Sequence, residues 1–98
     1  MKALKLVLAS RAFFQNEQFS IAFKTLAKAE LIGEKYSLYN ILNEIYYTQI
    51  SNAHLNKSLD LQKLRRKYQK NKRNILQDEN LNLFYAAIQD ELSQSNPQ

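Results

Sequence analysis

The fold of this chain follows from residues 19–33, which read FSIAFKTLAKAELIG. Apolar and small residues recur there at spacings of three and four, so that one side of a helix carries Phe19, Ala22, Phe23, Leu26, Ala29 and Gly33. The opposite side carries Lys24 and Lys28. Small side chains at Ala22, Ala29 and Gly33 allow a second helix to approach closely. We therefore predict an amphipathic helix that ends at Gly33 or within one turn of it.

The helix predicted before this stretch, residues 3–15, is apolar almost all round, with Leu4, Leu6, Val7, Leu8, Phe13 and Phe14. Such a helix must be covered on more than one side. Asn16 is a suitable break and a suitable N-cap for the helix that follows. The start of the chain superficially resembles a secretory signal, but Lys5 interrupts its apolar run and no cleavage site of small residues follows. We therefore expect a structural helix here.

A third helix is expected from an N-cap at Ser37 to about Ala53. Its wide apolar face comprises Leu38, Ile41, Leu42, Ile45, Tyr46 and Ile50. Its polar face carries only one charge, at Glu44. So little charge on a solvent-facing side indicates that this surface is partly covered or faces a partner.

A turn over residues 52–57 and a cap at Ser58 introduce a fourth helix, whose narrow apolar stripe comprises Leu61, Leu64, Tyr68, Asn71 and Ile75. Beyond Leu76 the apolar residues move to a face rotated by about 120° on an ideal wheel. This second stripe comprises Leu81, Phe84, Tyr85, Ile88 and Leu92. Either the helix breaks near residues 77–80 and a last helix covers 80–93, or one long helix meets a different partner. Residues 94–98 are expected to be frayed.

Composition sets the fold class. One glycine and one proline in 98 residues argue against a β-rich or doubly wound chain, which needs many tight turns. We predict a single all-α domain over residues 1–98, an array of antiparallel αα-hairpins with four or five helices. Residues 3–36 form the first hairpin and 37–76 a second, irregular one. The sequence contains no run of about 18 apolar residues, the length needed to span a membrane. A cytoplasmic location is the default expectation.

The sequence offers no set of residues for catalysis. Zero cysteines remove disulfides, thiolate metal sites and cysteine nucleophiles. The only histidine, His54, lies in the predicted turn without an identifiable second ligand or nucleophile. The adjacent acids Asp78–Glu79 and Asp90–Glu91 point about 100° apart on a helix and cannot easily share one ion. We expect no enzyme, no metal, no cofactor and no small-molecule substrate.

Charge is distributed unevenly along the chain. Residues 57–74 hold eight basic residues and one acid, whereas residues 75–98 hold four acids and no base. The basic face of the fourth helix could follow nucleic-acid phosphates through Lys63, Arg66, Lys67, Lys70 and Arg73. The same pattern is also typical of a helix that packs on one side and is solvated on the other. A third interpretation pairs these bases with the acids of residues 78–91, within one chain or between two.

Residues 3–36 resemble a tetratricopeptide repeat, a 34-residue helix–turn–helix unit. Leu6 stands at the first large position, Phe13 at the aromatic position, and the small–large–small positions of the second helix match Ala22, Leu26 and Ala29. Two hallmarks differ, because Leu6 replaces the tryptophan and Glu34 the proline. A second unit from Ser37 keeps Tyr47 as its aromatic residue and then departs from the pattern, reading Asn56, Asp60 and Lys63.

The resemblance implies a scaffold that binds protein segments in a groove between the first and third helices, and it implies no catalysis. Val7, Ile41 and Ile45 stand where some members hold a carboxylate through polar or basic groups, so the groove is expected to be apolar with Arg11 as its main charge. The predicted partner-binding residues are Leu4, Val7, Leu8, Arg11, Phe14 and Ile41. An array of fewer than three repeats leaves apolar faces open at its terminal units, so we expect a homodimer, a protein partner, or further repeats of a longer chain to cover them. Nucleic-acid binding through the fourth helix is the alternative.

Overall fold

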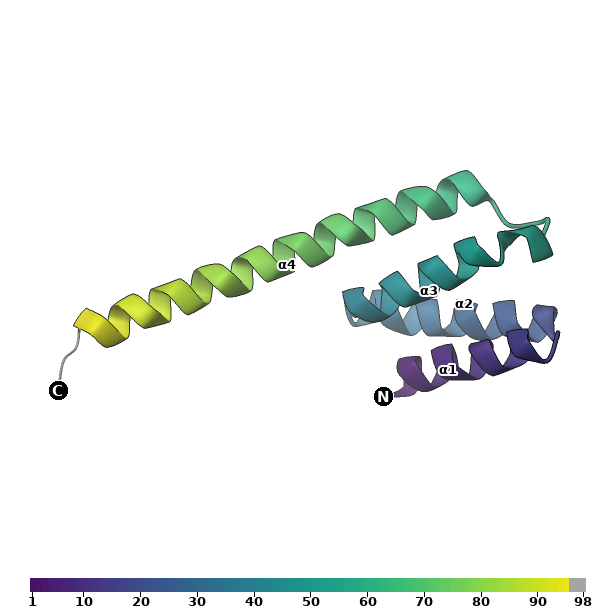
Figure 1. Cartoon of the computed structure of the whole chain (residues 1–98), viewed down its shortest axis with the longest axis horizontal. Coiled ribbons are helices and arrows are strands. Elements are labelled where there is room, and N and C mark those ends of the chain that lie inside the picture. The colour runs from purple at the N-terminus through teal and green to yellow at the C-terminus, as the bar shows by residue number, and fades with distance from the viewer. Residues whose placement is uncertain (96–98) are drawn as a thin grey trace.

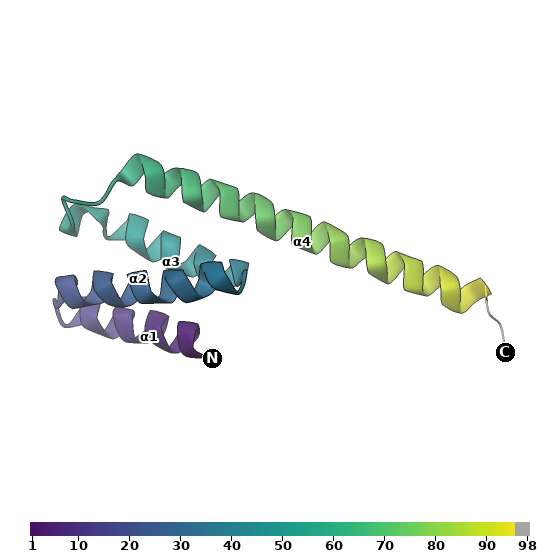
Figure 2. The ribbon, with the colours of Figure 1, turned by 180° about the vertical axis from the view of Figure 1, so that it is seen from behind.

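The computed structural model describes residues 1–95. They form four α-helices, namely α1 (Lys2–Gln15), α2 (Phe19–Lys35), α3 (Tyr39–Ser51) and α4 (Leu61–Ser95), with a short 3₁₀ helix, η1 (Ala53–Leu55), before α4. No strand occurs within these residues. Helices α1, α2 and α3 lie side by side, each antiparallel to the next, and α4 runs back along α3 (Figures 1 and 2). The predicted all-α class is confirmed.

All four helices contribute side chains to one core. Leu26 of α2 and Ile45 of α3 are fully buried at its centre, and they are joined by Val7, Ala29, Leu42, Tyr46 and Leu64. Full burial of one such aliphatic side chain stabilises the fold by about 1.5–3 kcal/mol. These are the residues at helical spacing in the sequence, so hydrophobic periodicity located most of the core.

Gly33 allows α2 and α3 to approach closely. It is buried in the last turn of α2, and its φ is not positive, so it is not a left-handed cap. A Cβ built on Gly33 would lie 2.8 Å from Cδ2 and 3.0 Å from Cγ of Leu42. The absence of a side chain therefore decides how near α3 can lie.

Two helix-start predictions were wrong for a common reason. Asn16 is the C-cap of α1, and Gln18, not Asn16, precedes α2 as its N-cap. In the same way Leu38, not Ser37, precedes α3. Helices α1 and α2 each end in a Schellman motif, in which the amide of Gln18 donates to the Phe13 carbonyl (2.9 Å) and that of Leu38 to the Gly33 carbonyl (2.9 Å).

The left-handed position of each motif is occupied by a residue other than glycine, Glu17 (φ 60°) or Ser37 (φ 53°). Both connections, residues 16–18 and 36–38, therefore share one geometry and turn the chain back within three residues. No side-chain hydrogen bond caps the start of α2 or α3. The polar residues that suggested helix starts serve the preceding helix ends instead.

The connection to α4 also differs from the prediction. Helix α3 ends at Ser51, before Ala53. Asp60 rather than Ser58 caps α4, because Asp60 Oδ1 accepts a hydrogen bond from the Lys63 amide at 3.1 Å. Ser58 donates instead to Asn56 Oδ1 at 2.7 Å, within the turn.

Helix α4 is one continuous helix, about 52 Å long at 1.5 Å per residue. Its first half packs on α3, and from Leu76 onward every side chain described is exposed. The molecule measures 62 × 27 × 20 Å, with a radius of gyration of 18.1 Å. A compact chain of this length would have about 13 Å. Of the predicted frayed tail, residues 94 and 95 belong to α4, and 96–98 lie outside the described residues.

Candidate protein-interaction surface

A groove between α1 and α3 contains most of the predicted partner-binding residues. Helix α1 packs mainly on α2 and touches α3 at few positions. This leaves a depression of about 470 Å³ lined by Leu4, Val7, Arg11, Asn40, Ile41 and Glu44. We call it the α1/α3 groove. It brings together four of the six predicted residues, Leu4, Val7, Arg11 and Ile41.

The six residues differ in how accessible they are. Leu4 and Leu8 are 47% and 53% exposed, so α1 keeps an open apolar side. Ile41 is half-buried and lines the groove. Val7 is 1% exposed and belongs to the core, which removes it from the set of available contacts.

Phe14 is also not a groove residue. Its ring packs edge-on against Phe23 of α2, with centroids 5.1 Å apart, and lies 6.4 Å from the ring of Phe19. These ring contacts hold the C-terminal end of α1 against the first turns of α2. Phe14 therefore packs within the first hairpin and does not line the α1/α3 groove, in which it was expected as a partner contact.

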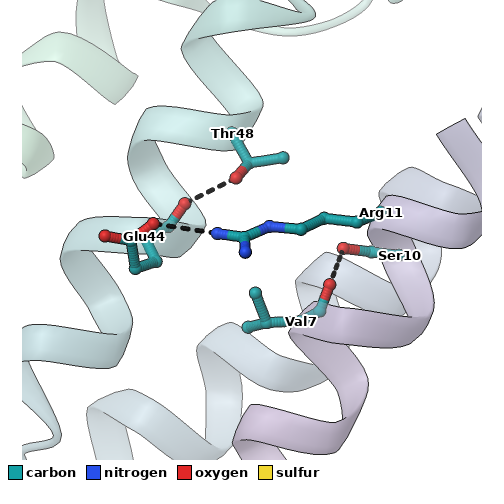
Figure 3. Close-up of polar contacts among 5 residues, drawn as sticks. All are labelled: Val7, Ser10, Arg11, Glu44 and Thr48. Carbon is teal, nitrogen blue, oxygen red and sulfur yellow. Dashed lines mark hydrogen bonds and ion pairs between the residues drawn. The ribbon is translucent and has the colours of Figure 1, made fainter. Parts of the chain in front are cut away.

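An ion pair bridges the α1/α3 groove. Arg11 Nη2 lies 2.9 Å from Glu44 Oε2, and Figure 3 shows the guanidinium reaching across from α1 to α3. Thr48 Oγ1 donates to the Glu44 carbonyl (2.7 Å), and Ser10 Oγ donates to the Val7 carbonyl (2.6 Å). Both charged side chains are about half exposed, so the pair stabilises the fold little. Arg11 is thus the expected charge of the groove, neutralised by Glu44.

The basic face of α4 keeps four of its five predicted residues exposed, Lys63, Arg66, Lys70 and Arg73. Lys67 differs, since its Nζ lies 2.9 Å from Glu30 Oε2 of α2. The hydrogen bond to Glu30 raises the pKa of Lys67. Lys67 therefore belongs to the packing of α4 on the bundle rather than to the solvent-facing side.

Tyr68 is not available for base stacking. Its ring is partly buried against the core, and Lys72 Nζ lies 4.7 Å from its centroid. The basic face therefore offers cations without an exposed aromatic partner on the same half of the helix.

A polar network that sequence reasoning missed connects α2, α3 and α4. Glu30 accepts from both Lys67 (2.9 Å) and Gln49 Nε2 (3.3 Å), and Tyr46 donates to Glu34 Oε1 (3.3 Å). Burial, followed by the nearby charges of Glu30 and Glu34, raises the pKa of Tyr46. Adjacent to it, Asn71 Nδ2 donates to the Tyr39 carbonyl at 2.8 Å. Lys67 and Asn71 fix α4 on the bundle, whereas the bonds of Gln49 and Tyr46 join α3 to α2.

The second stripe of α4 is exposed over its whole length. Exposure is 48% at Leu81, 60% at Phe84 and 38% at Ile88, with Tyr85 and Leu92 also exposed. We call these five residues the α4 seam. Large contiguous exposed apolar patches are typical of contact surfaces. The signal was present in the sequence as the change of phase after Leu76, although no site was assigned to it.

Other kinds of site find no support within residues 1–95. His54 is exposed in η1, and no group of three His, Cys, Asp or Glu side chains there could hold a metal ion. None of the described helices combines the length and the apolar character needed to cross a bilayer. Comparison with protein-family models, with curated proteins and with solved structures finds no match to this chain.

Proposed function

We propose that this chain is a non-enzymatic protein–protein interaction or self-association module of helical-repeat type, which binds through the apolar surface of α1 and α3. The observation that supports this function best is the exposure of Leu4 and Leu8 beside the α1/α3 groove. Burying two such side chains against a partner would contribute a few kcal/mol to binding. The proposal keeps the cytoplasmic location expected from the sequence.

The shape of the groove supports an extended or helical protein segment as the bound partner. Its walls are two helices, its accessible apolar lining comes from Leu4 and Ile41, and the Arg11–Glu44 pair closes the apolar stretch with a neutral polar bridge. The tetratricopeptide-like pattern of residues 3–36 agrees with such a role, since that resemblance implies binding between the first and third helices.

The test compares the double substitution Leu4→Asp/Leu8→Asp with Leu31→Asp, an exposed leucine on α2 far from the groove in sequence and 69% exposed. Two measurements are needed, the mass in solution and the proteins retained from source-cell extract with and without nuclease. We expect the groove variant to lose its partner or its oligomer while its melting temperature stays close to that of Leu31→Asp. Unchanged mass and unchanged retained proteins would contradict the proposal.

A nucleic-acid-binding role for α4 is the second candidate, supported by the exposed stripe of Lys63, Arg66, Lys70 and Arg73. Its test is oligonucleotide binding at several salt concentrations, because each neutralised phosphate contributes about 0.9 to the slope of log K against log salt. Arg66→Glu/Lys70→Glu/Arg73→Glu would abolish such binding, and Lys24→Glu/Lys28→Glu/Lys57→Glu is the control of equal charge. Equal loss in both variants would leave only a non-specific effect of net charge and reject this role.

A further inference from the structure

The projecting half of α4 combines an apolar stripe with charge of one sign. Residues 76–95 carry Asp78, Glu79, Asp90 and Glu91 and no basic residue. None of these four acids forms an ion pair within residues 1–95, where the ion pairs are Arg11–Glu44 and Lys67–Glu30. On an ideal wheel Asp78 and Glu91 flank the α4 seam, about 65° and 75° from its centre. The seam therefore fits a surface that is apolar in the middle and basic at its edges.

A second α4 seam does not meet this requirement. Residues 76–95 hold four acids and no base, so two such halves side by side would bring only like charges together and could form no ion pair. Like charges brought together across a contact oppose association. The basic half of α4 has the opposite charge, but its only large hydrophobic residue counted as exposed is Leu61, so it offers little apolar surface.

Helix α1 offers exposed apolar side chains and unpaired bases. It exposes Leu4 and Leu8 and contains no acid, and its bases are Lys2 and Lys5 besides Arg11, which is paired with Glu44. Lys2 and Lys5 make no ion pair within the described residues. The projecting half of α4 is about 30 Å long and α1 is about 21 Å long, so the seam can cover the whole exposed side of α1.

We infer that the α4 seam of one chain docks on the exposed α1 face, beside the α1/α3 groove, of a second copy. This inference rests on the proposed function and names the partner as the chain itself. Each contact joins two different surfaces, the α4 seam of one chain and α1 of another. Two chains whose seams each dock on the other's α1 form a closed dimer, whereas chains that dock one after another form a longer series. Apolar contact between the α4 seam and the leucines of α1 provides affinity, and the acids of α4 against the lysines of α1 fix the direction.

The first experiment measures the mass of the full chain in solution over a range of concentrations by light scattering and sedimentation equilibrium. We expect a mass at least twice the 11.5 kDa of one chain. Phe84→Asp/Ile88→Asp should weaken association by about tenfold or more. Leu76→Asp/Leu83→Asp is the matched control, because these leucines are exposed on the opposite side of the same half of α4 and the added charge is equal.

A charge exchange tests the pairing directly. Lys2→Glu/Lys5→Glu makes both surfaces of the chain acidic, and Asp78→Lys/Glu91→Lys makes both basic. Each variant alone should associate several-fold more weakly at low salt, and a mixture of equal amounts should recover the affinity of the original chain. Lys24→Glu/Lys28→Glu on α2 controls for net charge. If Lys2→Glu/Lys5→Glu associates as tightly as the original chain, the α1 docking site is rejected.

The outcomes separate this inference from the proposed function. Loss of the oligomer in both the α4 seam variant and Leu4→Asp/Leu8→Asp supports both. An oligomer that depends on Leu4 and Leu8 but tolerates Phe84→Asp/Ile88→Asp overturns the inference and supports the proposed function. A chain that is monomeric at every concentration also overturns the inference, and the proposed function then depends on a different protein that binds the groove.

Discussion

Substitution of Gly33 by alanine tests whether close helix approach determines the packing of α2 on α3. In an exposed helix position this change stabilises a protein, because alanine has the higher helix propensity by about 1 kcal/mol. At Gly33 the new methyl group would lie 2.8 Å from Cδ2 and 3.0 Å from Cγ of Leu42. Carbon atoms prefer separations of about 3.5–4.0 Å. Leu42 or the α3 backbone must therefore move by several tenths of an ångström.

The two effects oppose each other, and their magnitudes decide the sign. Leu42 is 4% exposed and packed in the core, so it has little room to rotate away. Overpacking of this kind costs about 1–3 kcal/mol. After subtraction of the propensity gain, we expect Gly33→Ala to lower the free energy of unfolding by about 1 kcal/mol. For a chain of this length that corresponds to about 4–8 °C in melting temperature.

The assay is urea unfolding followed by circular dichroism. Ala27→Gly, at an exposed position of the same helix, measures the propensity contribution alone and should cost about 1 kcal/mol. The double substitution Gly33→Ala/Leu42→Ala should cost less than the two single changes together, because truncating Leu42 removes the clash. If Gly33→Ala raises stability by the amount that Ala27→Gly lowers it, the close approach has no energetic importance and the reasoning fails.

Two further predictions concern polar contacts between helices. Lys67→Met leaves the Glu30 carboxylate, whose side chain is 16% exposed, without its cation, so we expect a loss of about 1–2 kcal/mol. Arg11→Met breaks a half-exposed pair and should cost less than about 0.5 kcal/mol; equal losses in urea unfolding would contradict this ranking. Unfolded tyrosine ionises near pH 10, whereas burial raises the pKa of Tyr46 in the fold, so its contribution is complete below about pH 10 and declines as the pH rises. Tyr46→Phe should make the fall in melting temperature above that pH shallower, and parallel curves for the two proteins would disprove it.

The elements and most of the core could be predicted from the sequence because they depend on spacing along one helix. The apolar positions of residues 19–33 identified α2 and its buried face, including Leu26 and Ala29. The stripe from Leu64 to Ile75 identified the packed half of α4. The change of phase after Leu76 is real, and the backbone continues through it without a break.

Contacts between helices could not be predicted, because they depend on the rotation and register of two elements at once. Arg11 and Glu44 are 33 positions apart, and Lys67 and Glu30 are 37 apart. Helix α1 was especially ambiguous, since an all-round apolar sequence does not reveal which residues face inward. Val7 and Leu8 are neighbours about 100° apart, and only the packing on α2 and α3 buries the first and exposes the second.

Because the backbone of α4 is uninterrupted, the number of residues in this helix determines the direction in which the α4 seam faces. Each residue inserted between Ile75 and Leu81 would turn the α4 seam by about 100° about the helix axis and move it outward by about 1.5 Å, while the bundle kept every contact. An insertion of four residues would restore the original bearing to within about 40°. Variants in which α4 is longer by whole turns would therefore present the α4 seam in nearly the same direction. A gain of one or two residues would turn the same side chains toward a different neighbour.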